Sequence, residues 1–254
     1  MHSGEITRWR WGGGRFGVSR GHFVTFDVCT RMGALKWPQD ATFLHATDTP
    51  MPRTPPQLIL ASGSRFRRQL MEQAGLTFAV VPATVDEPAA RAAMAREGDA
   101  FSPGEVALQL AALKALEVSQ KNPAALVIGS DQVLALGAGI FGKPESPAAA
   151  RRQLETLAGE THTLPTGVVL AQGGTVVWEH LGVATLTMRT LSPAFLDDYC
   201  ARAGSVVTDT VGGYALEGLG VQLFERIDGD YFTIIGLPLL PLLGELRRRG
   251  VVGM

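Results

Sequence analysis

The feature that most constrains this chain is an alternation of strand-like and helix-like segments that begins near Gln57 and continues almost to the end. Short apolar runs are followed by segments in which apolar residues recur every three or four positions. Such alternation is typical of α/β domains, in which helices cover a central sheet. The sequence therefore predicts one α/β domain of roughly 200 residues.

The pattern also predicts where the individual elements lie. We expect strands at 57–61, 77–82, 126–128, 168–170, 175–178, 183–188 and 222–227. We expect helices at 65–74, 103–120, 147–158, 193–203 and 238–249, and a hairpin through Gly137–Gly139. The helix after Ser102 has the clearest start, because Ser102 can cap it, Pro103 suits its first turn and Glu105 completes a capping box.

Charge and composition exclude several classes of protein. The chain has 23 basic and 24 acidic side chains and a net charge of -1, so no general attraction to nucleic acid or anionic lipid is expected. Its longest strongly apolar stretch, Ile234–Leu243, contains two prolines and is shorter than the roughly 20 residues of a membrane span. Two cysteines, Cys29 and Cys200, are too few for a disulfide framework or a structural zinc site. We therefore expect a cytoplasmic protein with no nucleic-acid or membrane partner.

The first fifty residues differ in character from the rest. They hold three of the four tryptophans and the run Gly12-Gly13-Gly14, and they lack regular hydrophobic periodicity. No apolar segment of the kind that a secretory signal requires follows their charged residues. At Met51 a proline-rich lead into the first core strand begins. We expect residues 1–50 to be a disordered extension or an artefact of an upstream start, and residues 51–254 to form the domain.

Ser64 and Arg67 stand where a glycine-containing turn leads into the first helix. The backbone N–H groups of a helix start, a hydroxyl and a guanidinium together form a natural anion site. On this turn alone, a capping serine and solvated arginines would be the better explanation. No P-loop motif is present, and no Gly-x-Gly-x-x-Gly follows the first core strand, so those two modes of nucleotide binding are unsupported.

Carboxylates form a second set of candidates. Asp86 and Glu87 follow the second expected strand, and Asp131 comes directly after the apolar residues 126–128. Acids at the carboxyl ends of strands lie where open α/β sheets bind ligands, and they can hold a divalent metal or accept a proton from water. Solvated loop carboxylates are the common alternative. Asp131 is the stronger candidate, because an apolar strand leads directly to it.

Lys114, late in its helix, and Lys143, next to a proline, are candidate phosphate ligands, although each alone would be interpreted as a surface lysine. The histidines of the domain, His162 and His180, have no evident partner for a serine or cysteine triad. We therefore interpret His162 as a local hydrogen-bonding residue. Chemistry directed at phosphate, with a hard cation, is the class that remains.

Taken together, these segments resemble the Maf family of nucleoside triphosphate pyrophosphatases. The matching segments occur in order between Gln57 and about Arg249, and they are Leu58–Arg68, Thr84–Glu87, Gly129–Gln132, Gly142–Pro144 and Gly236–Pro238. The resemblance implies an elongated mixed sheet flanked by helices, and frequently a homodimer. It also implies hydrolysis of a nucleoside triphosphate to the monophosphate and pyrophosphate with a divalent cation, Mg or Mn.

The resemblance further implies roles for individual residues. Asp131 falls on the family's proposed catalytic base, Ser64 and Arg67 on its Ser-x-x-Arg phosphate motif, and Glu87, Lys114 and Lys143 on further polar site positions. We interpret Glu87 and Asp131 as the metal ligands. The cationic side chains at 67, 114 and 143 would then stabilise the departing pyrophosphate.

Three positions separate two branches of the family, and this chain has Phe66, Gln132 and Glu217 there. An aromatic residue, Gln and Glu resemble the branch that acts on 7-methyl-GTP, whereas Arg, Thr and Gln are typical of the dTTP and UTP branch. Methylation at N7 makes guanine cationic, which favours an aromatic face and a carboxylate. Phe66 replaces the usual tryptophan, Arg65 replaces a usual proline, and core packing of Phe66 is the alternative. A dTTP or UTP pyrophosphatase and a non-catalytic nucleotide-binding regulator of cell division also stay open.

Overall fold

The computed structural model describes residues 8–11, 14–17, 56–96 and 101–253, and the chain divides into two compact units, Met1–Met51 and Pro52–Met254. In the first unit, β1 (Arg8–Trp11) and β2 (Gly14–Gly17) pair as an antiparallel hairpin. Most of the expected extension, residues 1–50, lies outside the described residues. Its interpretation therefore stays a prediction.

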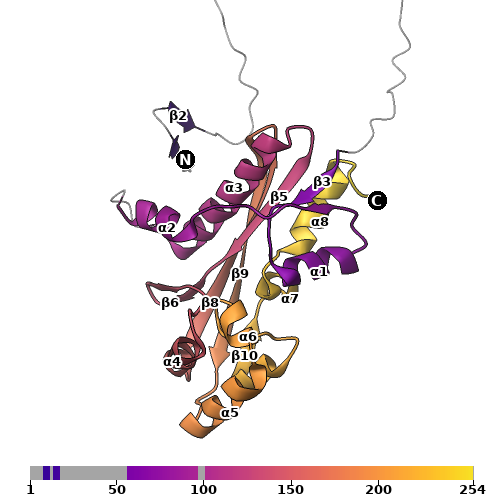
Figure 1. Ribbon diagram of the computed structural model, residues 1–254. Coiled ribbons are helices and arrows are strands. Elements are labelled where there is room, and N and C mark those ends of the chain that lie inside the picture. The colour runs from indigo at the N-terminus through magenta and orange to yellow at the C-terminus, as the bar shows by residue number, and fades with distance from the viewer. Residues whose placement is uncertain (1–7, 12–13, 18–55, 97–100, 254) are drawn as a thin grey trace, which may run out of the picture. The chain divides into compact units, whose positions relative to one another are not determined.

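The second unit is built on a mixed sheet that has eight strands among the described residues (Figure 1). The strands β10 (Phe224–Asp228), β9 (Thr175–Met188), β8 (Thr161–Gln172) and β5 (Leu126–Gln132) each run antiparallel to the next. By contrast, β3 (Leu58–Leu60) runs parallel to both β5 and β4 (Ala79–Val80). The hairpin of β6 (Leu134–Leu136) and β7 (Gly139–Phe141) attaches to β8. The predicted α/β class, with a mixed sheet, is confirmed.

Helices cover both faces of this sheet. On one face, α3 (Pro103–Lys121) packs along β5, β8 and β9, and Leu181 of β9 points toward its first turn at Gly104. The next residue of β9, Gly182, points the other way, toward Thr233 of α7 (Tyr231–Ile235). Successive residues of a strand face opposite sides, so α3 and α7 lie on opposite faces. The remaining helices are α1 (Arg65–Gln73), α2 (Glu87–Arg96), α4 (Pro147–Leu157), α5 (Pro193–Ala203), α6 (Val206–Asp209), η1 (Leu219–Leu223) and α8 (Leu239–Arg248).

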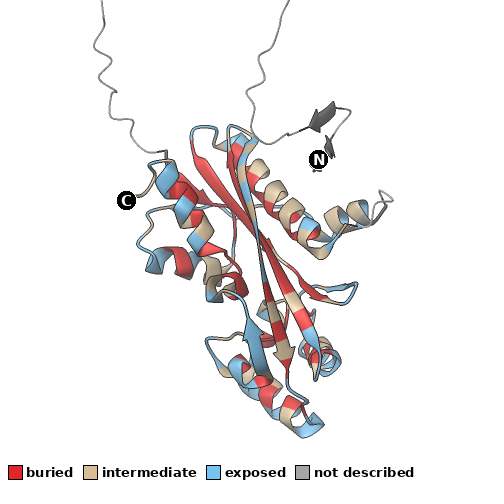
Figure 2. Cartoon of the chain, turned by 180° about the vertical axis from the view of Figure 1, so that it is seen from behind, coloured by how far each residue is buried: buried red, intermediate tan, exposed pale blue. Residues whose placement is uncertain are grey.

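Close approach of α3 to the sheet depends on two glycines. A Cβ at Gly129 of β5 would collide with the backbone oxygen of Ala111, and one at Gly167 of β8 would lie 2.8 Å from that of Ala107. Helix and strand backbones are therefore nearly in contact at the middle of the sheet. Burial follows the same plan, because β5 and most of β8 are buried on both faces (Figure 2).

Several local predictions are confirmed. The predicted helices correspond to α1, α3, α4, α5 and α8, and α3 begins with the expected reciprocal capping box of Ser102 and Glu105. The hairpin through Gly137–Gly139 is present as β6 and β7. Among the described residues, no helix combines the length and apolar character needed to cross a membrane.

Other local predictions are wrong. Asp131 does not follow its strand but lies inside it, because β5 continues to Gln132 and pairs with β8. The strands expected at 175–178 and 183–188 form one continuous β9, because Glu179 and His180 between them continue the strand's alternation of exposed and half-buried residues and do not form a turn. The strand expected at 77–82 is shorter, at Ala79–Val80.

Helices α2, α6 and α7 were not predicted. Glu87, for which no helix was expected, is the first residue of α2. Asp86 lies just before it and accepts a hydrogen bond from the backbone N–H of Ala89 at 2.9 Å. Asp86 is thus part of the start of a helix, which accounts for its carboxylate without a role in chemistry.

Candidate active site

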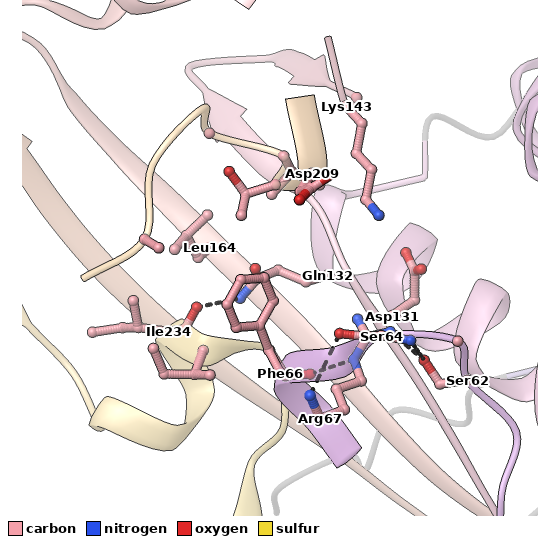
Figure 3. A pocket seen from close by; sticks show the side chains of 18 of the residues that line it. Ser62, Ser64, Phe66, Arg67, Asp131, Gln132, Lys143, Leu164, Asp209 and Ile234 are labelled. Atoms are coloured by element: carbon pink, nitrogen blue, oxygen red, sulfur yellow. Dashed lines mark hydrogen bonds between the residues drawn. The ribbon is translucent and has the colours of Figure 1, made fainter. Parts of the chain in front are cut away.

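A cleft of about 560 Å³ brings together residues from distant parts of the second unit (Figure 3). Its lining includes nine of the ten candidate residues singled out from the sequence, namely Ser64, Phe66, Arg67, Glu87, Lys114, Asp131, Gln132, Lys143 and Glu217. Asp86 is not part of that lining. The starts of α1 and α2, the middle of α3 and the end of β5 supply most of these side chains.

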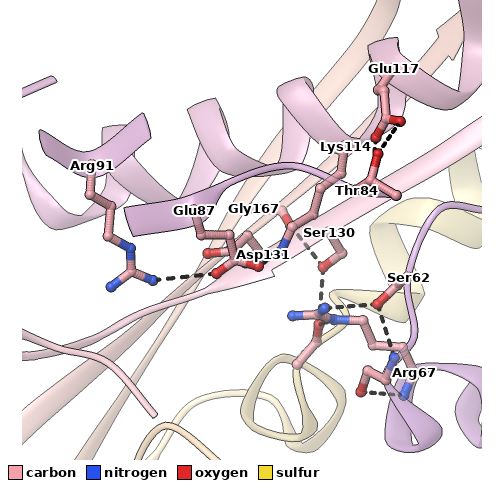
Figure 4. Close-up of polar contacts among 12 residues, drawn as sticks. Ser62, Arg67, Thr84, Glu87, Arg91, Lys114, Glu117, Ser130, Asp131 and Gly167 are labelled. Atoms are coloured by element: carbon pink, nitrogen blue, oxygen red, sulfur yellow. Dashed lines mark hydrogen bonds and ion pairs between the residues drawn. The ribbon is translucent and has the colours of Figure 1, made fainter. Parts of the chain in front are cut away.

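At the centre of the cleft, Lys114 joins two carboxylates (Figure 4). Its Nζ lies 2.6 Å from Oδ1 of Asp131 and 2.6 Å from Oε1 of Glu87. The side chain of Asp131 is 6% exposed and that of Glu87 is 40% exposed, so the lysine links a buried acid to one that solvent reaches. Lys114 is therefore committed to ion pairs within the protein.

The two carboxylates differ in their tendency to hold a proton. Burial raises the pKa of Asp131, although the charges of Lys114 and Arg67 act in the opposite direction. Burial also acts to raise the pKa of Glu87, but the hydrogen bond and charge of Lys114, together with the charges of Arg91 and Arg67, more than offset it and leave that pKa lowered. The second oxygen of Asp131, Oδ2, is buried and has no hydrogen-bond partner among the described residues. An acceptor in this state can bind a cation or a proton of water.

Arg67 is held in place by groups on both sides of the cleft. Its Nε donates to the backbone oxygen of Gly236 at 2.7 Å, and its Nη1 donates to Oγ of Ser62 at 3.1 Å. Ser64 caps α1, since its hydroxyl accepts from the backbone N–H of Arg67 at 3.4 Å. Burial lowers the pKa of Arg67, with Asp131 opposing this effect, yet a guanidinium stays charged at neutral pH.

The carbonyl of Gly236 also accepts a hydrogen bond from Oγ of Ser130 at 3.0 Å. Gly236 follows α7 with a φ of 107°, which favours glycine, and the atom nearest to a Cβ there would be Nε of Arg67, at 3.6 Å. The positive φ of Gly236, which favours glycine, thus orients its carbonyl toward both Arg67 and Ser130.

Phe66, Gln132 and Glu217 form a second part of the cleft. Phe66 is half-buried, belongs to none of the core clusters of the described residues, and carries the Arg65 guanidinium 4.8 Å from its ring centroid. Core packing therefore does not account for it. The amide nitrogen of Gln132 donates to Oγ1 of Thr166 at 2.9 Å and to two backbone carbonyls, and within the described part of the chain its oxygen accepts no hydrogen bond and is available to a ligand. Glu217 is exposed, in the turn before η1.

The segment that leads into α2 is fixed to α3. Thr84 donates from its backbone N–H and from its hydroxyl to the two carboxylate oxygens of Glu117, each at 2.7 Å (Figure 4). Hydrogen bonds from Lys121 and Thr84 lower the pKa of Glu117 to about 2. Because Glu117 lies three residues after Lys114 on the same helix, α3 positions both the lysine and the approach to Glu87.

His162 takes no part in the cleft lining. It is buried, its Nε2 lies 2.7 Å from the hydroxyl of Tyr214, and burial lowers its pKa to about 4. Its interpretation as a local hydrogen-bonding residue is confirmed. Cys200 is a free, partly buried cysteine, and Cys29 lies outside the described residues.

Sequence reasoning missed five polar residues of the lining, Ser62, Arg91, Asp209, Thr210 and Tyr214. Arg91 follows Glu87 by one helical turn, so recognition of α2 would have revealed it. Ser62 belongs to the Ser-Gly-Ser turn that was used only for Ser64. No comparable signal marked Asp209, which pairs with Arg65 at 3.3 Å.

The described residues contain no group of three His, Cys, Asp or Glu side chains that would hold a metal unaided. They do offer a pair of carboxylates, Glu87 and Asp131, with one buried oxygen that lacks a partner. Mg²⁺ is commonly held by one or two carboxylates together with substrate phosphates. The donor set therefore fits a cation that arrives with a phosphorylated ligand.

The fold and the cleft together define an α/β protein with a polar, two-part ligand site on a mixed sheet. The chain belongs to the Maf family, since the family model for Maf-like proteins matches residues 57–249. The resemblance inferred from the motifs is thereby confirmed.

Curated relatives match about three quarters of this chain. A 7-methyl-GTP pyrophosphatase from Brucella abortus is 51% identical over 192 residues, which is 76% of this chain and 96% of the relative. One from Rhizobium etli is 51% identical over 197 residues, or 78% of this chain and 98% of the relative. A nucleoside triphosphate pyrophosphatase from Bradyrhizobium diazoefficiens is 48% identical over 197 residues, or 78% and 96%.

Proposed function

We propose that this protein is a nucleoside triphosphate pyrophosphatase that hydrolyses 7-methyl-GTP to 7-methyl-GMP and diphosphate. The observation that carries the proposal is that Lys114 contacts both the buried Asp131 and the partly exposed Glu87. These three residues lie in a cleft that Arg67 and Lys143 also line. Relatives that are 51% identical to this chain over nearly their whole length are named 7-methyl-GTP pyrophosphatase.

In the mechanism that we infer, Asp131 accepts the proton of a water molecule. The water oxygen bonds to the α-phosphorus, the bridging bond between the α- and β-phosphates breaks, and diphosphate leaves with the electron pair. A raised pKa suits Asp131 to this task, because a stronger base takes a proton from water more readily. Arg67 and Lys143 stabilise the charge that develops on the leaving group.

A divalent cation, Mg or Mn, is part of the proposal. Glu87 and Asp131 would hold it, because hard carboxylate oxygens suit such ions and Oδ2 of Asp131 lacks a partner among the described residues. When bound, the cation would neutralise phosphate charge and make a coordinated water more acidic. Lys114 keeps Glu87 ionised by lowering its pKa.

The second part of the cleft supports a cationic base. The ring of Phe66 offers a π face that attracts the positive charge of 7-methylguanine, a contact worth roughly 0.5–2 kcal/mol. Glu217 adds a carboxylate to the same lining, and the free oxygen of Gln132 can accept from an N–H of the base.

The test is a comparison of diphosphate release from 7-methyl-GTP, GTP, UTP and dTTP with magnesium or manganese. We expect the highest kcat/KM for 7-methyl-GTP. A clear preference for dTTP or UTP would place the protein in the other branch, and nucleotide binding without turnover would indicate a non-catalytic regulator.

We also propose that the protein is cytoplasmic. We further propose that it forms a homodimer, which light scattering on the purified chain would test. Residues 1–50 are proposed to be dispensable, because residues 52–254 already form a compact unit. A protein that begins at Met51 should fold and turn over substrate. Loss of either property would contradict this proposal.

A further inference from the structure

We propose that Arg91 is a further phosphate-binding residue, which acts with Lys143 on the pyrophosphate half of the triphosphate. This rests on the proposed function and adds a residue that the matching motifs do not include. Arg91 lines the cleft from α2, one turn after Glu87, and Figure 4 shows Glu87 between Arg91 and Lys114.

The guanidinium of Arg91 has unused donors. Its closest ion pair, from Nη2 to Oε2 of Glu87, is 4.0 Å long, which exceeds a hydrogen bond. Its Nε is buried and has no hydrogen-bond partner among the described residues. A buried donor without a partner is unfavourable, and an incoming phosphate oxygen would relieve that cost.

The other cationic side chains of the cleft are occupied to different extents. Arg67 donates to Gly236 and Ser62, and Lys114 contacts both carboxylates. Within the part of the chain that the structure describes, Arg91 and Lys143 are the cations of the lining without a hydrogen bond. They are therefore the side chains most available to a polyanion.

Arg91 and the loop that carries Lys143 lie next to each other. A Cβ at Gly142 would lie 3.8 Å from Nη1 of Arg91. The arginine thus borders the backbone immediately before Lys143. Two cations from neighbouring segments suit the pyrophosphate half, which carries most of the triphosphate charge, and the planar fork of arginine can donate to two oxygens at once.

The test uses the full-length chain with Arg91→Gln and Arg91→Lys. The matched control is Arg68→Gln, which makes the same change in charge at an exposed arginine of α1 that pairs with Glu72 and does not line the cleft. Product inhibition by diphosphate and by the nucleoside monophosphate is measured separately, together with kcat/KM and the melting temperature.

For Arg91→Gln we expect diphosphate to inhibit about 10–100-fold more weakly, the range for one charge-assisted hydrogen bond, with unchanged inhibition by the monophosphate. Arg91→Lys should be intermediate, because it keeps the charge and loses the fork. Arg68→Gln should match the unaltered protein. Unchanged diphosphate inhibition in a folded Arg91→Gln, or equal weakening for both products, would overturn the proposal.

Failure of the proposed function would be seen separately, as absence of diphosphate release from every triphosphate by the unaltered protein. Equilibrium binding of inorganic diphosphate to the unaltered protein and to both Arg91 variants would then decide the role of Arg91. If Arg91→Gln melts at a lower temperature, Arg91→Lys alone decides, and diphosphate affinity equal to that of the unaltered chain would refute the assignment.

Discussion

The ammonium of Lys114 lies 2.6 Å from the buried carboxylate of Asp131, so the two candidate groups with opposite charges are bound to each other. Lys114 was expected to stabilise the negative charge that develops on the leaving pyrophosphate. Because Lys114 is paired with both carboxylates, its main effect is on them: it opposes the rise in the pKa of Asp131 and helps to lower the pKa of Glu87. Predictions about this centre therefore concern stability as well as turnover.

Asp131→Asn should reduce diphosphate release by about 10²–10⁴-fold, the usual contribution of a general base. It should reduce the free energy of unfolding at neutral pH less than Lys114→Met does, because Lys114 keeps Glu87 as an ion-pair partner. Burial raises the pKa of Asp131 in the folded protein, so the ionised carboxylate costs stability as pH rises through that pKa, and the neutral amide avoids the cost. Urea unfolding and a diphosphate assay measure both effects. Asp86→Asn, outside the cleft lining, is the control and should stay active.

Lys114→Met should lower the free energy of unfolding at neutral pH by about 3–5 kcal/mol, as expected for a buried ion pair that loses one partner. The deficit should shrink as pH falls below 4.5, the ordinary pKa of Glu87. Above that pH the lowered pKa of Glu87 contributes stability in the unaltered protein, and this contribution disappears on protonation. Unfolding at neutral and acid pH checks the trend, and a deficit that grows toward acid pH would contradict it.

Phe66→Ala should reduce kcat/KM for 7-methyl-GTP by about 2–30-fold more than for GTP, which corresponds to the loss of one cation–π contact. Phe66→Trp should enlarge the same ratio, because indole is the better π partner. Equal losses for both nucleotides would mean that the ring does not sense the charge of the base.

His162 should make the protein less stable as pH falls. Burial lowers its folded pKa to about 4 from 6.5, so between these values the unfolded chain binds the extra proton. Stability should rise with pH across this window, by roughly 3 kcal/mol in total. Urea unfolding of the unaltered protein and of His162→Gln measures the slope, and the variant, which cannot titrate, should show a shallower one.

Gly129→Ala should destabilise the protein by about 1–3 kcal/mol or more, because the added methyl group would meet the backbone of α3 at Ala111. Gly244→Ala is the matched control, since it lies inside α8 with no atom within 4 Å of its added Cβ. It should be neutral or stabilise the helix by up to about 1 kcal/mol. Thermal denaturation of both variants separates crowding from helix propensity.

Sequence patterns predicted elements wherever a local signal and the tertiary environment agreed. The capping box at Ser102 and the apolar stripe of α3 are such a case. Helix α2 was missed because Pro88 and a run of alanines leave it without a clear apolar face. The end of β5 was misplaced because Ser130 and Asp131 are polar, and polarity within a short run is easily taken for a strand end.

The nine candidate site residues were found through motifs, and the structure shows that they share one cleft. Their pairing was out of reach, because nothing in the sequence states that Lys114 and Asp131 point at each other across a helix and a strand. Arg91 was missed for the same reason, since its place in the cleft depends on an unpredicted helix. Roles for these residues stay predictions that the variants above address.

Because Thr84 is hydrogen-bonded to Glu117, α3 fixes the position of two sides of the cleft, the side that carries Lys114 and the side formed by α2. Lys114, on one face of this helix, places its ammonium above the sheet. Three residues later on the same helix, Glu117 anchors the segment that leads into α2. A displacement of α3 along its axis would shift both sides by the same amount, so the spacing between them is insensitive to such slippage. The two sides would instead become misaligned if α2 were detached from α3. A mutation of Glu117 can therefore lower catalytic activity although Glu117 does not contact the substrate.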